Sequence, residues 1–172
     1  MTYKVLNNIT LKNVSDGVLS NVLTELLVLP VNKKILASPE FKELDKKSNG
    51  YISRSIKDSI SPSNQNHLIS SLGGVKAKKI LLINDLNEKD DIYLWLNKYK
   101  YIAKIANSIG CKNLAVLDGQ NYPKGKDKFW FLETISRSIE SGAYIFSTTK
   151  NKTAKRSEEH TSERQSQPDL VC

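Results

Sequence analysis

Histidine and cysteine are scarce in this chain, which holds two of each among 172 residues. So few cysteines cannot form the disulfide framework of a small secreted protein, and we therefore expect a reducing, cytoplasmic setting. Long apolar runs are also missing. None approaches the roughly 18 residues of a membrane span, and the amino terminus lacks the apolar stretch of a secretory signal. These absences exclude a membrane protein and favour a globular cytoplasmic domain with no membrane partner.

The same scarcity limits the chemistry that the chain can carry. His67 has no second histidine, cysteine or carboxylate at the spacing of metal ligands, and we expect it to lie at a strand end. Cys111 has no histidine nearby in the sequence to activate its thiol, which favours a packing role. The pair Gly73-Gly74 lacks the G-x-G-x-x-G spacing of a phosphate-binding loop and predicts a turn. These patterns give no catalytic and no metal-binding residue.

Positive charge is what the sequence has in excess. The formal net charge is +8, and it is +10 without residues 156–172, which hold two arginines and four carboxylates. Many of the lysines come in pairs, such as Lys33-Lys34 and Lys78-Lys79, and not in one long block. Two interpretations stay open: a solvated surface, or a surface that binds the phosphate backbone of a nucleic acid.

Short apolar runs alternate with helical patterns along the chain. The apolar runs predict strands at 26–29, 67–72, 80–83 and 113–119. We expect Pro30 to end the first of them. Capping residues, Ser38 among them, and apolar periodicity predict helices at 38–47, 51–60, 88–109 and 128–146. Asn49-Gly50 is expected to break the chain between the first two helices, and Gly110 to close the third. Expected inward residues of the last three helices include Ile60, Ile92, Leu132, Ile135, Ile139, Ala143 and Phe146. Asn87 is the expected cap of the third helix, and the polar residues 147–155 are typical of a linker. The alternation predicts a three-layer α/β domain.

Two aspartates follow predicted strands and are the candidates for a binding crevice. Asp85 ends "LLIND" and Asp118 ends "AVLDG". Ligands of open α/β sheets bind at the carboxyl ends of the strands, so carboxylates there could line a crevice. The alternative is that both residues simply begin turns. Trp130 also has two possible roles: a platform on which a ligand ring stacks, or an inward anchor of the last helix.

The stretch "LDKKSNGYISRSIKD" at residues 44–58 resembles the N-terminal domain of the cytosol (leucine) aminopeptidase family. The resemblance continues in order through "KKILLIND", the helix from Glu88, "NLAVLDG" and "IESGAYIFSTTKNK", and it covers most of residues 20–152. It implies a macro-domain-like α/β sandwich over residues 1–150, with a mixed sheet and helices on both faces. Residues 151–155 would begin a linker to a missing C-terminal catalytic domain.

The resemblance also implies what the intact protein does. In this family the catalytic domain uses two divalent metal ions, manganese or zinc, to release N-terminal amino acids from peptides, and the enzymes are homohexamers. The family's Asn-Thr-Asp-Ala-Glu-Gly-Arg motif does not occur here, so no catalytic or metal-binding residue transfers to this sequence. We expect this part to be inactive by itself. Two alternatives are a stand-alone macro-type module that binds ADP-ribose or a related nucleotide, and a basic nucleic-acid-binding domain.

The last residues differ from the rest of the chain. Residues 156–166, "RSEEHTSERQS", resemble the conceptual translation of a common sequencing-library adapter at every position but Arg164. We therefore expect residues 156–172 to be a foreign, disordered tail. That interpretation removes His160 and Cys172 from the chemical inventory.

Overall fold

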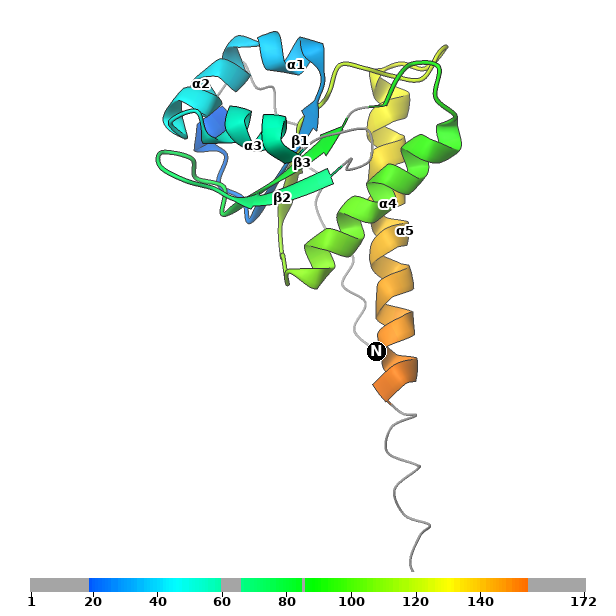
Figure 1. Ribbon diagram of the computed structural model, residues 1–172. Helices are drawn as coiled ribbons and strands as arrows, with labels where there is room; N and C mark the ends of the chain where they lie inside the picture. The colour runs from blue at the N-terminus through cyan, green and yellow to red at the C-terminus, as the bar shows by residue number, and fades with distance from the viewer. Residues whose placement is uncertain (1–18, 60–65, 85, 155–172) are drawn as a thin grey trace, which may run out of the picture.

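The computed structural model describes residues 19–59, 66–84 and 86–154, and their side chains as far as residue 142. Its described strands form one mixed sheet in the order β2-β3-β1-β4 (Figure 1). The strands are β1 (Leu26–Val31), β2 (Asn66–Ser70), β3 (Lys79–Asn84) and β4 (Leu114–Val116). Strand β1 lies between β3 and β4 and is parallel to both, whereas β2 runs antiparallel to β3.

Helices cover both faces of this sheet. The helices α1 (Lys33–Ala37), α2 (Pro39–Lys47) and α3 (Tyr51–Ser59) pack on one face, and α4 (Ile92–Ser108) and α5 (Lys128–Ala154) pack on the other (Figure 1). Successive side chains of a strand point to opposite faces. Leu27 and Leu29 of β1 accordingly join Phe41 in one core cluster, while Leu26 and Val28 join the other. All six β1 residues are buried, which confirms the predicted three-layer α/β fold.

Pro30 lies inside β1, so the prediction that it ends the strand was wrong. The amide of Leu117 donates to the carbonyl of Val28 at 3.0 Å, which shows that the polar groups of Val28 face β4. The backbone polar groups of Pro30, two residues further along the strand, face β4 as well. The next bond of a parallel ladder would join the amide of residue 30 to the carbonyl of Leu117, and proline has no amide hydrogen. Strand β4 ends at Val116, where the missing donor ends the ladder.

The stretch at 44–58 holds the end of α2, the turn that follows it and most of α3. Ser38 caps α2 as predicted, accepting from the amide of Phe41 at 3.2 Å. The predicted break falls at Asn49 and Gly50, whose φ angles are 55° and 73°. The carboxylate of Asp45 reaches across this turn and accepts from the amide and the hydroxyl of Ser53, at 2.9 and 2.7 Å. These contacts give the stretch a structural role.

Helix α4 begins later than its sequence pattern indicates. Asp91, and not Asn87, is its cap, with a side-chain oxygen that accepts from the amide of Tyr93 at 3.0 Å. The predicted inward residue Ile92 is 39% exposed, and Trp95 is fully buried in its place. The end of the helix is as expected, since Gly110 takes a φ of 67° directly after the C-terminal cap, Ile109.

Helix α5 continues to Ala154, so residues 147–154 are helical and not a linker. No proline or glycine follows Gly142 in this stretch to interrupt the backbone ladder. The first half of α5 packs on α4, and its last turns project beyond the rest of the domain (Figure 1). Of the predicted inward residues, Ile135 and Ile139 are buried, whereas the side chains of Ala143 and Phe146 lie outside the described ones.

Several predictions fall on residues that the structure does not describe. These are Asp85, Ile60 and the tail at 156–172. Among the described helices, none combines the length and the apolar character that a membrane crossing requires.

Candidate functional site

The carboxyl ends of the parallel strands form a topological switch point. Strand β1 leads into α1 on one face of the sheet, whereas its neighbours β3 and β4 lead into α4 and α5 on the other face. Connections that leave adjacent strands in opposite directions open a crevice between them, and ligands of open α/β sheets bind there. The site to inspect is therefore the end of β1.

A hollow of about 170 Å³ lies at this edge. It is lined by Asn32, Lys33 and Lys34 after β1, by Glu88 from the β3–α4 connection and by Asn121 from the β4–α5 connection. Ammonium and carboxamide groups donate hydrogen bonds to anions, and a carboxylate accepts them from hydroxyl groups. The lining thus combines the two kinds of group that a phosphorylated sugar requires.

Asn32 and Lys34 join the β1–α1 connection to the loop after β4. The side-chain oxygen of Asn32 caps α1 by accepting from the amide of Ile35 at 2.7 Å. Its amide nitrogen donates to the carbonyl of Gly119, also at 2.7 Å. The ammonium of Lys34 donates to the carbonyl of Gln120 at 2.9 Å. Two of the polar groups at the hollow are therefore hydrogen-bonded to backbone carbonyls.

The predicted site residue Asp118 organises the loop that follows β4. One carboxylate oxygen accepts from the amide of Gln120 at 2.9 Å, and the other accepts from the hydroxyl of Tyr122 at 2.8 Å. Gln120 takes a left-handed φ of 54°, which is uncommon for a residue with a side chain. Burial, together with the bond to Asp118, raises the pKa of Tyr122 to about 12. Asp118 thus serves the turn, as the alternative interpretation held.

The same loop is also bonded to the β3–α4 connection. The side-chain amide of Asn121 donates to the carbonyl of Leu86, and the backbone amide of Lys124 donates to the carbonyl of Glu88 at 2.9 Å. Three connections from three strands are therefore held together over the sheet edge.

Sequence reasoning indicated the same edge of the sheet as this hollow, but not the residues that line it. Asp118 lies at this edge and is not among the lining residues, and Asp85 lies outside the described ones. The missed residues are Asn32, Lys33, Lys34, Glu88 and Asn121. Asn32-Lys33-Lys34 directly follows a buried strand, so the rule applied to the aspartates would have found it. Glu88 and Asn121 give no such signal, because long-range loop contacts place them.

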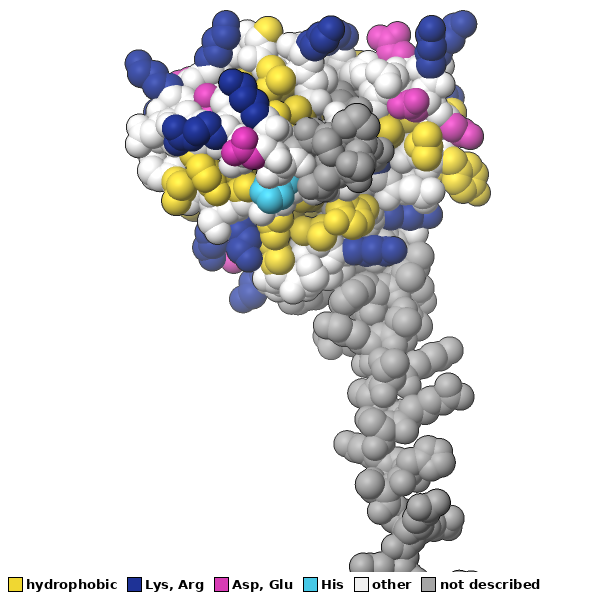
Figure 2. Space-filling view, in the orientation of Figure 1, with side chains coloured by type: hydrophobic (Ala, Val, Ile, Leu, Met, Phe, Trp, Pro, Cys, Tyr) yellow, Lys and Arg dark blue, Asp and Glu magenta, His cyan; other side chains and the backbone are white. Residues whose placement is uncertain are grey.

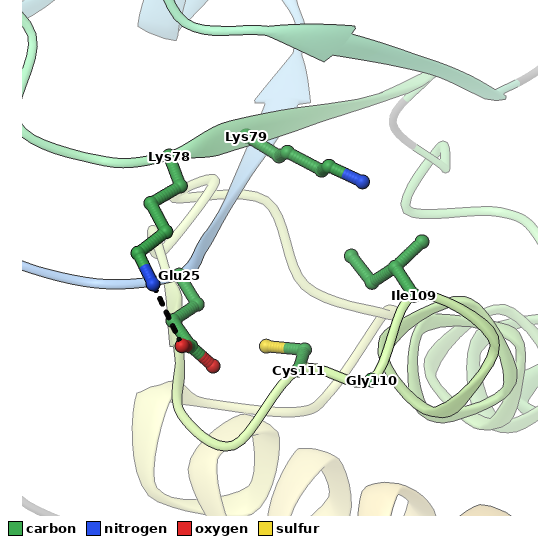
Figure 3. A pocket seen from close by; sticks show the side chains of 6 residues that line it. All are labelled: Glu25, Lys78, Lys79, Ile109, Gly110 and Cys111. Atoms are coloured by element: carbon green, nitrogen blue, oxygen red, sulfur yellow. Dashed lines mark hydrogen bonds and ion pairs between the residues drawn. The ribbon is translucent and has the colours of Figure 1, made fainter.

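A second hollow, of about 140 Å³, lies at the opposite edge of the sheet, near the start of β1 (Figure 3). Glu25, Lys78, Lys79 and Cys111 line it, together with Ile109 and Gly110. The ammonium of Lys78 lies 3.0 Å from the carboxylate of Glu25, as the dashed line in Figure 3 shows.

Glu25 and Cys111 of this second hollow are hydrogen-bonded to their neighbours. The backbone amide of Lys112, at 2.6 Å, and the ammonium of Lys78 hold the pKa of Glu25 below its ordinary value. Burial raises the pKa of the Cys111 thiol, which donates to the carbonyl of Asn113 at 2.8 Å. A protonated, hydrogen-bonded thiol is a poor nucleophile, in agreement with the predicted packing role.

The aromatic residues of α4 and α5 form part of the core. Trp95, Tyr99 and Phe131 contact one another with ring centroids 5.6 to 6.5 Å apart, and Tyr122 packs on Phe131 at 5.3 Å. Trp130 is partly buried against the same cluster, which favours the inward anchor over the stacking platform.

Positive side chains are scattered over the face of the molecule that Figure 2 shows. Figure 2 shows lysine and arginine side chains at separate points of this face, with acidic side chains between them. The nucleic-acid interpretation stays a prediction. Within the described part of the chain, no three histidine, cysteine or carboxylate side chains are placed to hold a metal ion together.

Comparison with known proteins identifies the fold. No protein-family model and no curated protein matches this sequence. Among solved structures, the chain is similar to the macrodomain of Mycobacterium tuberculosis DarG, with a TM-score of 0.51 and 14% sequence identity. The similarity covers 76% of this chain and 88% of that one. The fold is therefore macro-domain-like, as predicted, while the low identity leaves function to be argued from the site.

The comparison corrects the activity that was drawn from the family resemblance. The structural neighbour is a macrodomain and not an aminopeptidase, so the aminopeptidase and metallopeptidase assignment has no support. The resemblance of the domain itself to that family's N-terminal domain stays a prediction, as do the metal ions, the peptide substrates and the homohexamer.

Proposed function

We propose that this domain is a binding module for a nucleotide of the ADP-ribose type, held at the carboxyl edge of the sheet. The observation that carries the proposal is the hollow at the switch point. There the donor side chains of Lys33 and Asn121 line the same cavity as the carboxylate of Glu88. Such donors suit phosphate oxygens, and the acceptor suits ribose hydroxyls. The macro-domain-like fold supports the same choice.

The charge of the ligand follows from the same lining. Two lysines and one glutamate contribute, so the hollow carries a net positive charge. The sequence holds no G-x-G-x-x-G stretch that would supply backbone amides to a diphosphate. Lysine ammonium groups can take over that role as point charges. The proposal therefore requires the phosphates, and a nucleoside without them should not bind.

Calorimetry with the 172-residue chain tests the proposal. ADP-ribose should release measurable heat at or below millimolar concentration, and adenosine should not. Replacing Lys33 by alanine should weaken binding on the order of tenfold, as expected for losing a charge-assisted hydrogen bond. Lys104→Ala removes an exposed lysine in the second half of α4 and is the matched control. No heat with millimolar ADP-ribose would remove this function.

A further inference from the structure

Residues 118–122, which we call the strap, cross the carboxyl end of β1. They follow β4 on one side of β1, and Asn121 bonds to Leu86 beyond the end of β3 on the other side. Between these two points, the carbonyls of Gly119 and Gln120 accept from side chains of the β1–α1 connection. Because β1 lies between β4 and β3, the strap must pass over the switch point.

The strap takes up the donors that a phosphate would need. The ammonium of Lys34 and the carboxamide of Asn32 line the hollow, and each donates to a backbone carbonyl of the strap. Asn121 of the strap itself donates to the carbonyl of Leu86. Carbonyl and phosphate oxygens both accept such bonds. The carbonyl oxygens of Gly119 and Gln120 thus occupy places where phosphate oxygens would accept.

The size of the hollow leads to the same conclusion. Ligand pockets for molecules of nucleotide size measure roughly 300–1,000 Å³. The hollow beside the strap measures about 170 Å³, which admits a phosphate group but not an adenine, two riboses and a diphosphate together. Something at this edge has to move before a whole nucleotide can enter.

We propose that the strap is an internal competitor, which must lift before the nucleotide can bind to the donors beneath it. The inference rests on the proposed function. Its latch is the Asp118 carboxylate, which holds both the amide of Gln120 and the hydroxyl of Tyr122. The left-handed backbone at Gln120 stores strain that lifting would release. If the lifted state is a minor one, the apparent affinity for the nucleotide is lower by its population.

Tyr122→Phe tests the strap without changing the lining of the hollow. The ring keeps its packing on Phe131, and only the hydrogen bond to Asp118 is lost. The lifted state should become more populated, so ADP-ribose should bind the variant on the order of tenfold more tightly. Hydrogen exchange at residues 118–122 of the unliganded full chain should become faster. Tyr93→Phe makes the same chemical change at an exposed position of α4 and is the control.

Four outcomes decide between the possibilities. Tighter binding together with faster exchange in Tyr122→Phe, with Tyr93→Phe unchanged, supports the strap. Equal affinities despite faster exchange overturn the strap and leave the proposed function standing. Weaker binding by Tyr122→Phe also overturns it, because the latch would then assist the ligand. If neither wild type nor variant binds ADP-ribose, the proposed function fails and the strap fails with it.

Discussion

The carbonyl oxygen of Lys100 lies 2.8 Å from the position that a Cβ on Gly142 would occupy, and the Cβ of Ala103 lies 2.9 Å from it. Helices α4 and α5 therefore approach each other at a point where only glycine fits. Gly142→Ala should destabilise the domain by about 1–2 kcal/mol, because overpacking against a backbone carbonyl exceeds the gain in helix propensity. Urea unfolding would measure this change, and a more stable variant would show that the helices separate freely.

Gly73 and Gly74 form a matched pair for a second test. Gly73 takes a φ of 67°, and a Cβ there would lie 2.6 Å from the carbonyl oxygen of Lys47. A Cβ on Gly74 would meet the Lys47 side chain at an ordinary 3.7 Å. We expect Gly73→Ala to lower the free energy of unfolding by about 1–3 kcal/mol and Gly74→Ala to change it by less than about 0.5 kcal/mol. Equal effects would contradict the geometry of this turn.

The ionisation of Tyr122 gives a pH test of the latch. Its pKa rises to about 12 in the folded protein from an ordinary 10.0. The difference in 295 nm absorbance between wild type and Tyr122→Phe should therefore titrate near pH 12 when folded and near pH 10 in urea. Because the folded pKa is the higher one, the stabilisation from this hydroxyl is complete below pH 10 and is lost as the pH rises towards 12. A folded midpoint near 10 would mean that the hydroxyl is neither buried nor bonded to Asp118.

Cys111 should react slowly with alkylating reagents. Burial raises its thiol pKa, so less thiolate is present at neutral pH than for an ordinary cysteine. In a Cys172→Ser variant, iodoacetamide at pH 7.5 should modify the folded protein several-fold more slowly than the urea-unfolded chain. The raised pKa also means that the stabilisation from this thiol is present at neutral pH and declines as the pH rises past its ordinary value. Equal rates in both states would show an open, ordinary thiol.

The sequence predicted the layers of the fold because local signals determine them. The Ser38-Pro39 cap and the apolar run of β1 need no distant partner to be recognised. The start of α4 was placed wrongly, because both Asn87 and Asp91 are acceptable caps. Packing of Trp95 on Phe131, a contact 36 residues apart in the chain, decides which turn faces inward. Helix propensity alone does not tell which of the two caps begins α4.

The candidate site was predictable only as an edge. Asp118 drew attention because it ends a strand, yet its carboxylate is bonded to Gln120 and Tyr122 of its own loop. Lys34 is bonded to a residue that lies 86 positions further along the chain, and Asn121 is bonded to one that lies 35 positions before it. Pairings at such separation depend on the order of the strands, which a single sequence does not display.

Pro30 has a consequence for the path of the chain well beyond its own strand. Because Pro30 has no amide hydrogen to donate, β4 would form no further backbone hydrogen bond by continuing alongside β1. The backbone therefore turns away after Leu117. That departure sends residues 118–122 across the sheet edge instead of along it. The missing amide hydrogen of Pro30 therefore helps to set the path of the loop that follows β4. Replacing Pro30 by valine would restore the amide donor, so that β4 could pair with β1 over more residues. The loop after β4 would then no longer cross the crevice that it now covers.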